Sequence, residues 1–540
     1  MRVLLINPQY PIDETPSPPL GLGFIAAVLE QAGIEVKLLD FVVFPYSRKI
    51  LEYHINRFSP DVVGATCVTM SFDNAIRVIR DAKNINPEIA TVMGGPHVSF
   101  NVEPTLSAFP ELDVIVRGEG ENTIVHLVKS IEQNTDFAAV EGIAFRNGEH
   151  IHITGSRKPV DINRLPLPAR HHIPLGRYRA LGMPVSMTSS RGCPFQCIFC
   201  VGRKMVGAGV RYRNPVSVAD EMSQLSRMGF HQINLADDLF TANTIHCTNV
   251  CDAIINRGLN VQWTSFARVD TVSGEILKKM KAAGCHTVSF GVESGNPEML
   301  KRIKKGITRR QVIDAVRMCL DAGLSPQASF ILGLPGETPE TMQDSIEFGQ
   351  VLRKMGVQHG FHILAPFPGT EIRENIDRYD LKILTNDWRR YHANRAVVET
   401  SAVNAKMMND IVIGWEEKYD LHLRRLAALR KNGGGTADEL WPLTRLEHTV
   451  LIYDLFMDRT IERLKPFSPA DSDEAFILQL ANLAVRTYEP QSKRTCGLDA
   501  ICRTLTFAVE QNYLTYTRKN GGIKWEWADY INEGFKNDPI

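Results

Sequence analysis

Three cysteines lie close together near the middle of the chain, in the segment SSRGCPFQCIFC. Cys193, Cys197 and Cys200 have the spacing C-x3-C-x2-C, whereas the other cysteines are scattered along the 540 residues. Thiolates hold iron–sulfur clusters, and closely spaced cysteines on one loop can face one cluster. Three ligands leave a fourth iron open to a substrate, as the open position does in catalytic metal sites. The spacing therefore predicts a reactive cluster.

Two other interpretations of these cysteines remain. A structural zinc site would require a fourth Cys or His at suitable spacing, and none is close by in the sequence. Buried cysteines can also pack as small apolar side chains. Clustered cysteines in a large chain point to metal or redox chemistry more than to disulfides, so the cluster is preferred.

Downstream polar residues follow successive strand-like runs. The pair Asp237-Asp238 ends NLADD, Arg268 ends SFAR, and Glu293 ends FGVE. A guanidinium suits a planar anion such as a carboxylate. Taken singly, the aspartates could cap a helix and Arg268 could be a surface charge. Their order at successive strand ends instead predicts one ligand-binding edge.

Together these features resemble the radical S-adenosylmethionine superfamily, whose signature is this cysteine spacing with an aromatic residue before the third cysteine; here that residue is Phe199. The resemblance covers roughly residues 185–370. It implies a [4Fe–4S] cluster bound by Cys193, Cys197 and Cys200, with S-adenosylmethionine chelating the fourth iron. Reductive cleavage would then give methionine and a 5′-deoxyadenosyl radical. It also implies an electron donor such as flavodoxin or ferredoxin.

The same resemblance implies contacts to S-adenosylmethionine. Asp237 and Asp238 match groups that hydrogen-bond its ammonium, Arg268 could pair with its carboxylate, and Glu293 matches a residue that binds the ribose hydroxyls. The segments ILGLPGET and FHILAPFPGT resemble backbone that lies along the adenosine. The expected S-adenosylmethionine-binding residues are thus Asp237, Asp238, Arg268, Glu293, Gly333 and Pro335.

Six strand-like runs must position these residues. They alternate with helix-like stretches between 185 and 384, which predicts a partial (β/α)6 barrel that is open on one side. The runs are MPVSMTSS, HQINLADD, VQWTSFA, TVSFGVES, PQASFILGL and GFHILAPF.

The first 135 residues also alternate strand-like and helix-like segments. Such alternation predicts an α/β fold with a doubly wound, Rossmann-like sheet, whose ligands bind over the carboxyl ends of the strands. The expected strands are 2–6, 35–40, 61–66, 90–94 and 113–117, and the expected ligand loops lie around 8–20, 66–71, 94–97 and 118–122.

This region resembles the cobalamin-binding domain that precedes the radical domain in one subclass. The matching segments are NPQYP, PPLGLGFIAAVLEQAG, GGPHVSF and VRGEGENT. The resemblance implies cobalamin contacts from Gly94, Gly95, His97, Gly118, Glu119 and Gly120.

The cobalt ligand below the corrin follows no common pattern here. The sequence has no D-x-H-x-x-G motif, so the resemblance implies cobalamin bound without a protein histidine below the cobalt. A nucleotide-binding or purely structural domain is the alternative, although no G-x-G-x-x-G follows the first strand.

The remaining segments complete the predicted organisation. An Asn147-Gly148 turn predicts a hairpin over 139–155, followed by a Pro-rich linker. The C-terminal region is expected to be mostly helical, with its tryptophans in helix cores or in a lid over the barrel. Cys247, Cys251, Cys496 and Cys502 predict no second cluster. The expected domains are 1–135, 136–184 (hairpin and linker), 185–384 and 385–540.

Charge and hydropathy limit the classes of molecule that the protein is expected to bind. Lys+Arg and Asp+Glu both number 61, so net charge favours neither nucleic acid nor an anionic membrane. MRVLLINPQY is expected to be a strand and not a signal peptide, and no apolar run is long enough to span a bilayer. These features predict a cytoplasmic protein, and the resemblance implies that it acts on a small organic molecule.

Three functions are compatible with this sequence. The first is cobalamin-dependent radical methylation of an unactivated carbon, which is the commonest outcome in the subclass. The second is a non-methylating radical cyclase or oxidative rearrangement enzyme with a tetrapyrrole- or lipid-type substrate, like the anaerobic magnesium-protoporphyrin IX monomethyl ester cyclase. The third is an Fe–S binding protein without turnover, which the full set of expected cofactor residues disfavours. The substrate itself is not encoded in any motif.

Overall fold

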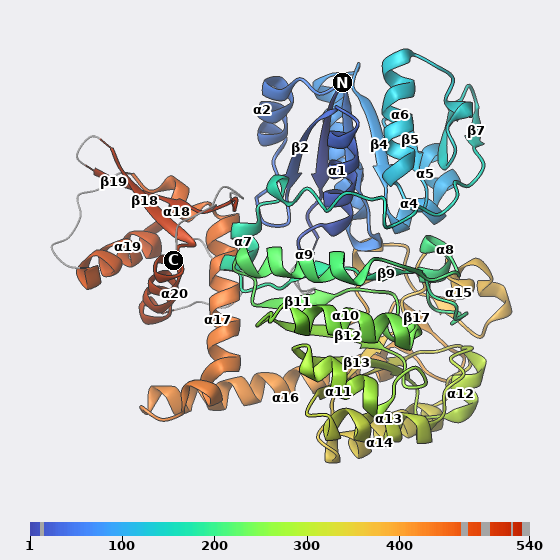
Figure 1. The fold of residues 1–540 in the computed structure, drawn as a ribbon, viewed down its shortest axis with the longest axis vertical. Coiled ribbons are helices and arrows are strands. Elements are labelled where there is room, and N and C mark those ends of the chain that lie inside the picture. Colours follow the sequence, from blue (N-terminus) through green and yellow to red (C-terminus); the bar gives the residue numbers. More distant parts are fainter. Residues whose placement is uncertain (11–15, 466–472, 488–496, 520–521, 532–540) are drawn as a thin grey trace.

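The computed structural model describes residues 1–10, 16–465, 473–487, 497–519 and 522–531 (Figure 1). Residues 11–15 of the expected ligand loop, and Cys496, lie outside these ranges. Two sheets, one above the other in Figure 1, form the main body, and a helical region extends to one side. Within the described ranges, no helix is long and apolar enough to cross a membrane.

The upper sheet has seven strands in the order β2-β1-β3-β4-β5-β6-β7. The first five are parallel, and the order 2-1-3-4-5 is a doubly wound arrangement whose ligand crevice lies at the reversal between β1 and β3. All five expected strands are therefore present. Their bounds are β1 Arg2–Asn7, β2 Glu35–Asp40, β3 Val62–Thr66, β4 Ala90–Gly94 and β5 Val114–Val116.

Helices cover both faces of this sheet. Val3 and Leu5 of β1 pack toward α1 and α6, whereas Leu4 and Ile6 pack toward α2 and α3. A strand buried on both faces reads as a continuous apolar run, which explains the sequence VLLI. The helices are α1 Leu20–Gln31, α2 Arg48–Phe58, α3 Phe72–Ile85, α4 Pro96–Phe100, α5 Val102–Ala108 and α6 Glu121–Gln133, with a 3-10 turn η1 at Thr69–Ser71.

The expected hairpin extends the same sheet. Strands β6 Ile143–Asn147 and β7 His150–Ile153 are antiparallel, and β6 pairs with β5. The Pro-rich stretch that follows holds only a 3-10 turn, η3 Arg170–His172, and a short helix, α7 Leu175–Ala180.

The lower sheet has six parallel strands in the order β15-β14-β13-β12-β11-β8. Because β8 and β15 end this order, the sheet is a partial barrel, as the sequence predicts. The strands are β8 Val185–Met187, β11 Gln232–Leu235, β12 Gln262–Ala267, β13 Cys285–Glu293, β14 Ser325–Leu332 and β15 Gln358–Ile363.

Helices of the barrel begin at residues that cap them. Asn243, Ser273, Thr308 and Thr338 each accept a hydrogen bond from a backbone N–H of the first turn. The helices are α8 Gly202–Val206, α9 Pro215–Arg227, α10 Thr244–Asn256, α11 Gly274–Ala282, α12 Pro297–Arg302, α13 Arg309–Asp321, α14 Pro339–Lys354 and α15 Glu371–Glu374. Short strand pairs, β9 Ser190–Arg191 with β10 Arg211–Tyr212 and β16 Lys382–Ile383 with β17 Val398–Glu399, lie at its periphery.

The C-terminal region is mostly helical, with one addition. The glycine-rich segment 432–435 separates α16 Ala405–Lys431 from α17 Ala437–Met457, and α18 Thr460–Arg463, α19 Asp473–Thr487 and α20 Leu498–Glu510 follow. The region ends in an antiparallel hairpin of β18 Leu514–Lys519 and β19 Gly522–Trp527. Trp525 and Trp527 are buried in this hairpin, so the expectation that they belong to a helix core is wrong.

Candidate functional site

The loop after β8 carries the three clustered cysteines to the carboxyl edge of the barrel. Cys193 and Cys197 are half-buried and Cys200 is exposed, whereas Cys67, Cys247, Cys251, Cys285 and Cys319 are all buried. The clustered cysteines therefore do not pack as small apolar side chains. The Cys197 sulfur lies beside Arg268, which follows the neighbouring strand β12.

The spacing of the three sulfur atoms fits a cluster better than a single ion. Zinc ligands lie about 2.0–2.3 Å from the metal, so sulfurs on one ion would be roughly 4 Å apart. Among the described residues, only one group of three His, Cys, Asp or Glu ligand atoms lies mutually within 4.8 Å, and it does not contain these cysteines. A cube of irons and sulfides spans the wider separation.

Cations lie beside Cys197. Arg268, which is 7% exposed, follows β12, and its guanidinium is 4.0 Å from the Cys197 sulfur and 3.5 Å from the Phe195 ring centroid. The same guanidinium is held by Asp270 and by the Lys305 carbonyl oxygen. Burial raises the pKa of Cys197, and the charges of Lys305 and Arg268 oppose that shift. These cations favour the thiolate form that iron requires.

Glu293 occupies a strained position at the end of β13. Its φ is 69°, and the register with β14 shifts between Gly291 and Glu293. Its buried carboxylate accepts a 2.7 Å hydrogen bond from the ammonium of Lys305, which is also buried. Non-glycine residues at positive φ cluster at ligand sites.

The two adjacent aspartates differ in their surroundings. Asp237 is 3% exposed and accepts three 2.6 Å hydrogen bonds, from the Ser189 backbone N–H and from the hydroxyls of Ser189 and Ser190. Asp238 is exposed and accepts one hydrogen bond from the Gly192 N–H. Of the pair, Asp238 is the carboxylate that is available beside the cysteine loop.

The turn after β14 is held by a carboxylate that follows it in the chain. Gly333 has φ +76° and donates its N–H to the Glu337 carboxylate at 2.5 Å. The Pro335 carbonyl oxygen accepts from Arg302. Burial raises the pKa of Glu337 to about 7, and its second oxygen, Oε1, has no hydrogen-bond partner. Gly333 and Pro335 thus lie in a tight turn after β14.

In the upper sheet, Gly94, Gly95 and His97 form the turn between β4 and α4. Gly95 has φ +106°, and a Cβ there would lie 2.6 Å from the Cys67 carbonyl oxygen, so glycine is required by packing. His97 is 1% exposed, with Nδ1 3.2 Å from the Thr69 hydroxyl and Nε2 3.4 Å from the Asn101 amide. Burial lowers its pKa to about 4, so the ring is neutral.

Gly118, Glu119 and Gly120 form the next turn, between β5 and α6. The carboxylate of Glu119 contacts Arg191 of β9 and Arg211 of β10, and Arg191 also pairs with Glu121 at 2.6 Å. This ion-pair network joins the carboxyl edge of the upper sheet to the loop that carries the cysteines. The two ligand-binding edges therefore face each other.

One contact between the upper sheet and the region after the barrel is not predicted by the sequence. The 3-10 turn η6 (Trp388–Arg390) packs against η1 and α3 of the upper sheet, and the Trp388 ring lies 4.9 Å from the His97 ring. Arg373 lies 4.9 Å from the Trp388 ring. From the sequence we expect Trp388 to belong to the mostly helical C-terminal region. No local pattern indicates its contact with His97.

Family models match both halves of this junction. The model described as B12 binding domain matches residues 14–128, and the Radical SAM superfamily model matches residues 187–349. An uncharacterized methyltransferase of Pyrococcus horikoshii is 35% identical over 400 residues, covering 72% of this chain and 86% of its own length. The anaerobic magnesium-protoporphyrin IX monomethyl ester cyclase of Rubrivivax gelatinosus is 30% identical over 433 residues, covering 76% of each chain.

Solved structures share the fold. OxsB, a cobalamin-dependent S-adenosylmethionine radical enzyme with aqua-cobalamin and S-adenosylmethionine bound, superposes with a TM-score of 0.66 at 17% identity, covering 95% of this chain and 81% of that one. TsrM of Kitasatospora setae, a methyltransferase with cobalamin and a [4Fe–4S] cluster bound, gives 0.62 at 22% identity, covering 72% and 81%.

Proposed function

Because this chain belongs to the radical S-adenosylmethionine enzymes that carry a B12-binding domain, we propose that it methylates an unactivated carbon of a small organic substrate. The observation that carries methylation is the 35% identity to a methyltransferase over 86% of that relative's length. The cysteine edge and the B12-binding edge face each other, which supports a substrate held between the two cofactors.

When bound, the cluster would supply the electron for reductive cleavage of S-adenosylmethionine, and cobalamin would supply the methyl group. Cys193, Cys197 and Cys200 would hold the cluster. Their accessibility and spacing, with two cations near Cys197, support that assignment.

The proposed contacts to S-adenosylmethionine divide into two groups. Asp238 is exposed beside the cysteine loop, and the buried Gly333 and Pro335 lie in the turn after β14; all three are proposed to contact the cofactor directly. The other three residues already have protein partners: Asp237 accepts from the Ser189 hydroxyl, Arg268 pairs with Asp270, and Glu293 pairs with Lys305. We propose that Asp237 fixes the cysteine loop, whereas Arg268 and Glu293 exchange or share partners when the cofactor binds.

The proposed cobalamin contacts also divide. We propose that the backbone of Gly94, Gly95, Gly118 and Gly120, at the facing edge, approaches the corrin closely. Glu119 is engaged with two arginines, so it is proposed to hold the edges together. The buried, neutral His97 has both ring nitrogens near other groups, and we propose that it shapes the site without binding cobalt.

The cyclase alternative is favoured by a specific observation, the 30% identity to the Rubrivivax enzyme over 76% of both chains. A methyltransferase of this class forms both S-adenosylhomocysteine and 5′-deoxyadenosine, whereas a cyclase need not form the former. The products therefore separate the two functions.

The experiment uses the full chain, reconstituted anaerobically with iron, sulfide and cobalamin and reduced chemically. We expect incubation with S-adenosylmethionine carrying a CD3 group to give S-adenosylhomocysteine and a CD3 group on the cobalamin. Cys197→Ala should abolish 5′-deoxyadenosine, and Cys502→Ala, on α20, should not. Formation of 5′-deoxyadenosine without any S-adenosylhomocysteine would favour the cyclase. Full cleavage by Cys197→Ala would refute the cluster assignment.

We further propose that a flavodoxin or ferredoxin delivers the electron and that the enzyme works in the cytoplasm. A plant-type ferredoxin, at about −400 mV, would supply the electron at low potential. Reduced donors of this kind and an unoxidised cysteine loop both require a reducing compartment.

A further inference from the structure

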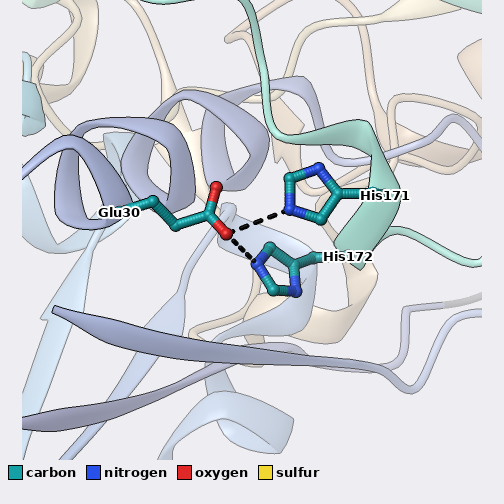
Figure 2. Close-up of side chains that lie close together, drawn as sticks. All are labelled: Glu30, His171 and His172. Carbon is teal, nitrogen blue, oxygen red and sulfur yellow. Dashed lines mark hydrogen bonds and ion pairs between the residues drawn. The ribbon is translucent and has the colours of Figure 1, made fainter. Parts of the chain in front are cut away.

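Two histidines and a glutamate converge on the surface (Figure 2). Glu30 comes from the last turn of α1, and His171 and His172 come from the turn η3. The Nε2 atoms of His171 and His172 lie 3.0 and 2.8 Å from the same oxygen, Oε1 of Glu30. Figure 2 shows both rings pointing to that oxygen, with the second carboxylate oxygen turned away from them.

The donor set is that of a divalent transition-metal site. All three ligand atoms lie within 4.8 Å of one another, and among the described residues no other group of three meets that condition. Two imidazoles and one carboxylate are common zinc ligands at about 2.0–2.2 Å, with water in the remaining position. Donors around such an ion are roughly 3.3 Å apart. The two distances to Glu30 are 3.0 and 2.8 Å, and the two Nε2 atoms lie within 4.8 Å of each other, so rotations of these surface side chains would admit the ion.

The turn that carries the histidines is anchored on both sides. Arg170 forms an ion pair with Glu221 at 2.7 Å, and their side chains are 4% and 0% exposed. The Ala169 N–H donates to the Gly23 carbonyl oxygen of α1 at 2.9 Å. These contacts fix the turn against the start of α1 and against the barrel without any contribution from the histidine side chains. Such rigid support from neighbouring residues is what a metal site needs.

The local charge also favours a cation. Glu30 lies at the C-terminal end of α1, where the helix dipole is negative, and the last turn of α1 contains no Lys, Arg or His. The ion pairs of Glu30 go to the two histidines, which carry charge only when protonated. A divalent ion would compensate the carboxylate and the helix end together.

We propose that Glu30, His171 and His172 bind one zinc-class divalent ion, separate from both cofactors. The ion would fasten the linker turn to α1 and so fix the linker that joins the upper sheet to the barrel. The proposal is independent of the reaction, because none of these residues belongs to the facing edges.

The test uses the full chain with its cluster reconstituted, so that the cysteines are occupied, followed by titration with Zn2+ and metal analysis after desalting. We expect one zinc per chain in the unmodified protein. His172→Gln and Glu30→Gln should each weaken binding at least tenfold. His126→Gln, an exposed histidine on the neighbouring helix α6, is the matched control and should bind zinc normally.

Two further measurements keep the outcome decisive. Iron content should be equal in all variants, which shows that the fold and cluster survive the substitutions. Co2+ added in place of zinc should give the visible bands of a four- or five-coordinate ion in the unmodified protein and in His126→Gln only. Equal zinc binding in all variants, or none in the unmodified protein, would overturn the proposal.

Discussion

At the scale of single residues, the site depends on charges that are buried in pairs. Lys305 and Glu293 have side chains only 7% and 8% exposed and meet at 2.7 Å. The neighbouring Lys304 pairs with Glu371 at the same distance, but both of those side chains are much more exposed. Buried and exposed ion pairs differ in what their loss costs, because only a buried partner is left without water.

Lys305→Met is expected to destabilise the protein by about 3–5 kcal/mol, since it leaves the Glu293 carboxylate buried and unpaired. Lys304→Met is the matched control and should cost less than about 1 kcal/mol. Thermal unfolding followed by circular dichroism compares the two. Equal shifts of the midpoint would contradict a buried role for Lys305.

His97 should not ligate cobalt. Its neutral ring is buried between the Phe72 and Trp388 rings, with each nitrogen near a polar side chain. The electron paramagnetic resonance spectrum of protein-bound Co(II) cobalamin should therefore be identical in protein made with 14N- and 15N-histidine. A change in nitrogen splitting on labelling would show that a histidine binds the metal.

At the scale of elements, sequence reasoning was most successful for buried parallel strands. Near-continuous apolar runs such as VLLI mark strands of the upper sheet, and strand-length alternating runs such as QWTSFA mark strands of the barrel, so eleven parallel strands could be placed. The hairpin β18–β19 was missed, although Ile523, Trp525 and Trp527 alternate as a half-buried strand should, and Asn520-Gly521 is a hairpin dipeptide. The expectation that these tryptophans belong to a helix core is contradicted by their alternation.

The site could be predicted only where its residues are local. The spacing of Cys193, Cys197 and Cys200 and the strand-end positions of Asp238 and Gly333 are visible in the sequence. Other contacts join residues that are far apart in the chain. Ser189 donates a hydrogen bond to Asp237, Arg211 pairs with Glu119, and the Trp388 ring contacts His97. No local pattern encodes such partners.

The turn after β14 carries a pH-dependent group. The pKa of Glu337 is raised from its ordinary 4.5 to about 7 by burial, so the folded protein holds this proton over a range in which the unfolded chain has lost it. This proton contributes about 3 kcal/mol to the free energy of unfolding. The contribution is fully present below about pH 4.5, falls as the pH rises, and is lost above about pH 7.

Glu337→Gln should remove this dependence. The unmodified protein is expected to lose more thermal stability between pH 6 and pH 8 than the variant does, because the glutamine stays neutral throughout. Glu340→Gln, at the exposed start of α14, should behave like the unmodified protein. Parallel pH profiles for all three proteins would exclude Glu337 as the titrating group.

At the scale of the whole molecule, α7 is the point where three parts meet. Arg177, 2% exposed, donates to the Val43 carbonyl oxygen after β2, to Glu462 of α18 and to Asp529 beyond β19. Its guanidinium lies between the Phe44 and Phe456 rings, 3.9 and 4.4 Å from their centroids. One side chain therefore fastens the C-terminal region to the upper sheet.

Arg177→Met should release the C-terminal hairpin. Removing one member of a buried charge network costs about 2–5 kcal/mol, so amide hydrogen exchange in β18 and β19 should accelerate at least about tenfold. Arg463→Met, which removes a half-exposed arginine of the same region, is the control and should leave exchange in the hairpin unchanged. Unaltered exchange in Arg177→Met would show that the hairpin is held by other contacts.

The order of strands has a consequence for synthesis on the ribosome. In each large sheet most hydrogen-bonded neighbours are also consecutive in the chain, and the upper sheet is complete at Ile153, before the cysteine loop begins. Domains tend to fold as they emerge, N-terminal first. The corrin-binding edge is thus expected to form before Cys193 has been translated, whereas the contact of Arg177 with Asp529 forms last. Nascent chains stalled after β7 should already resist protease, and cobalamin could be acquired before iron.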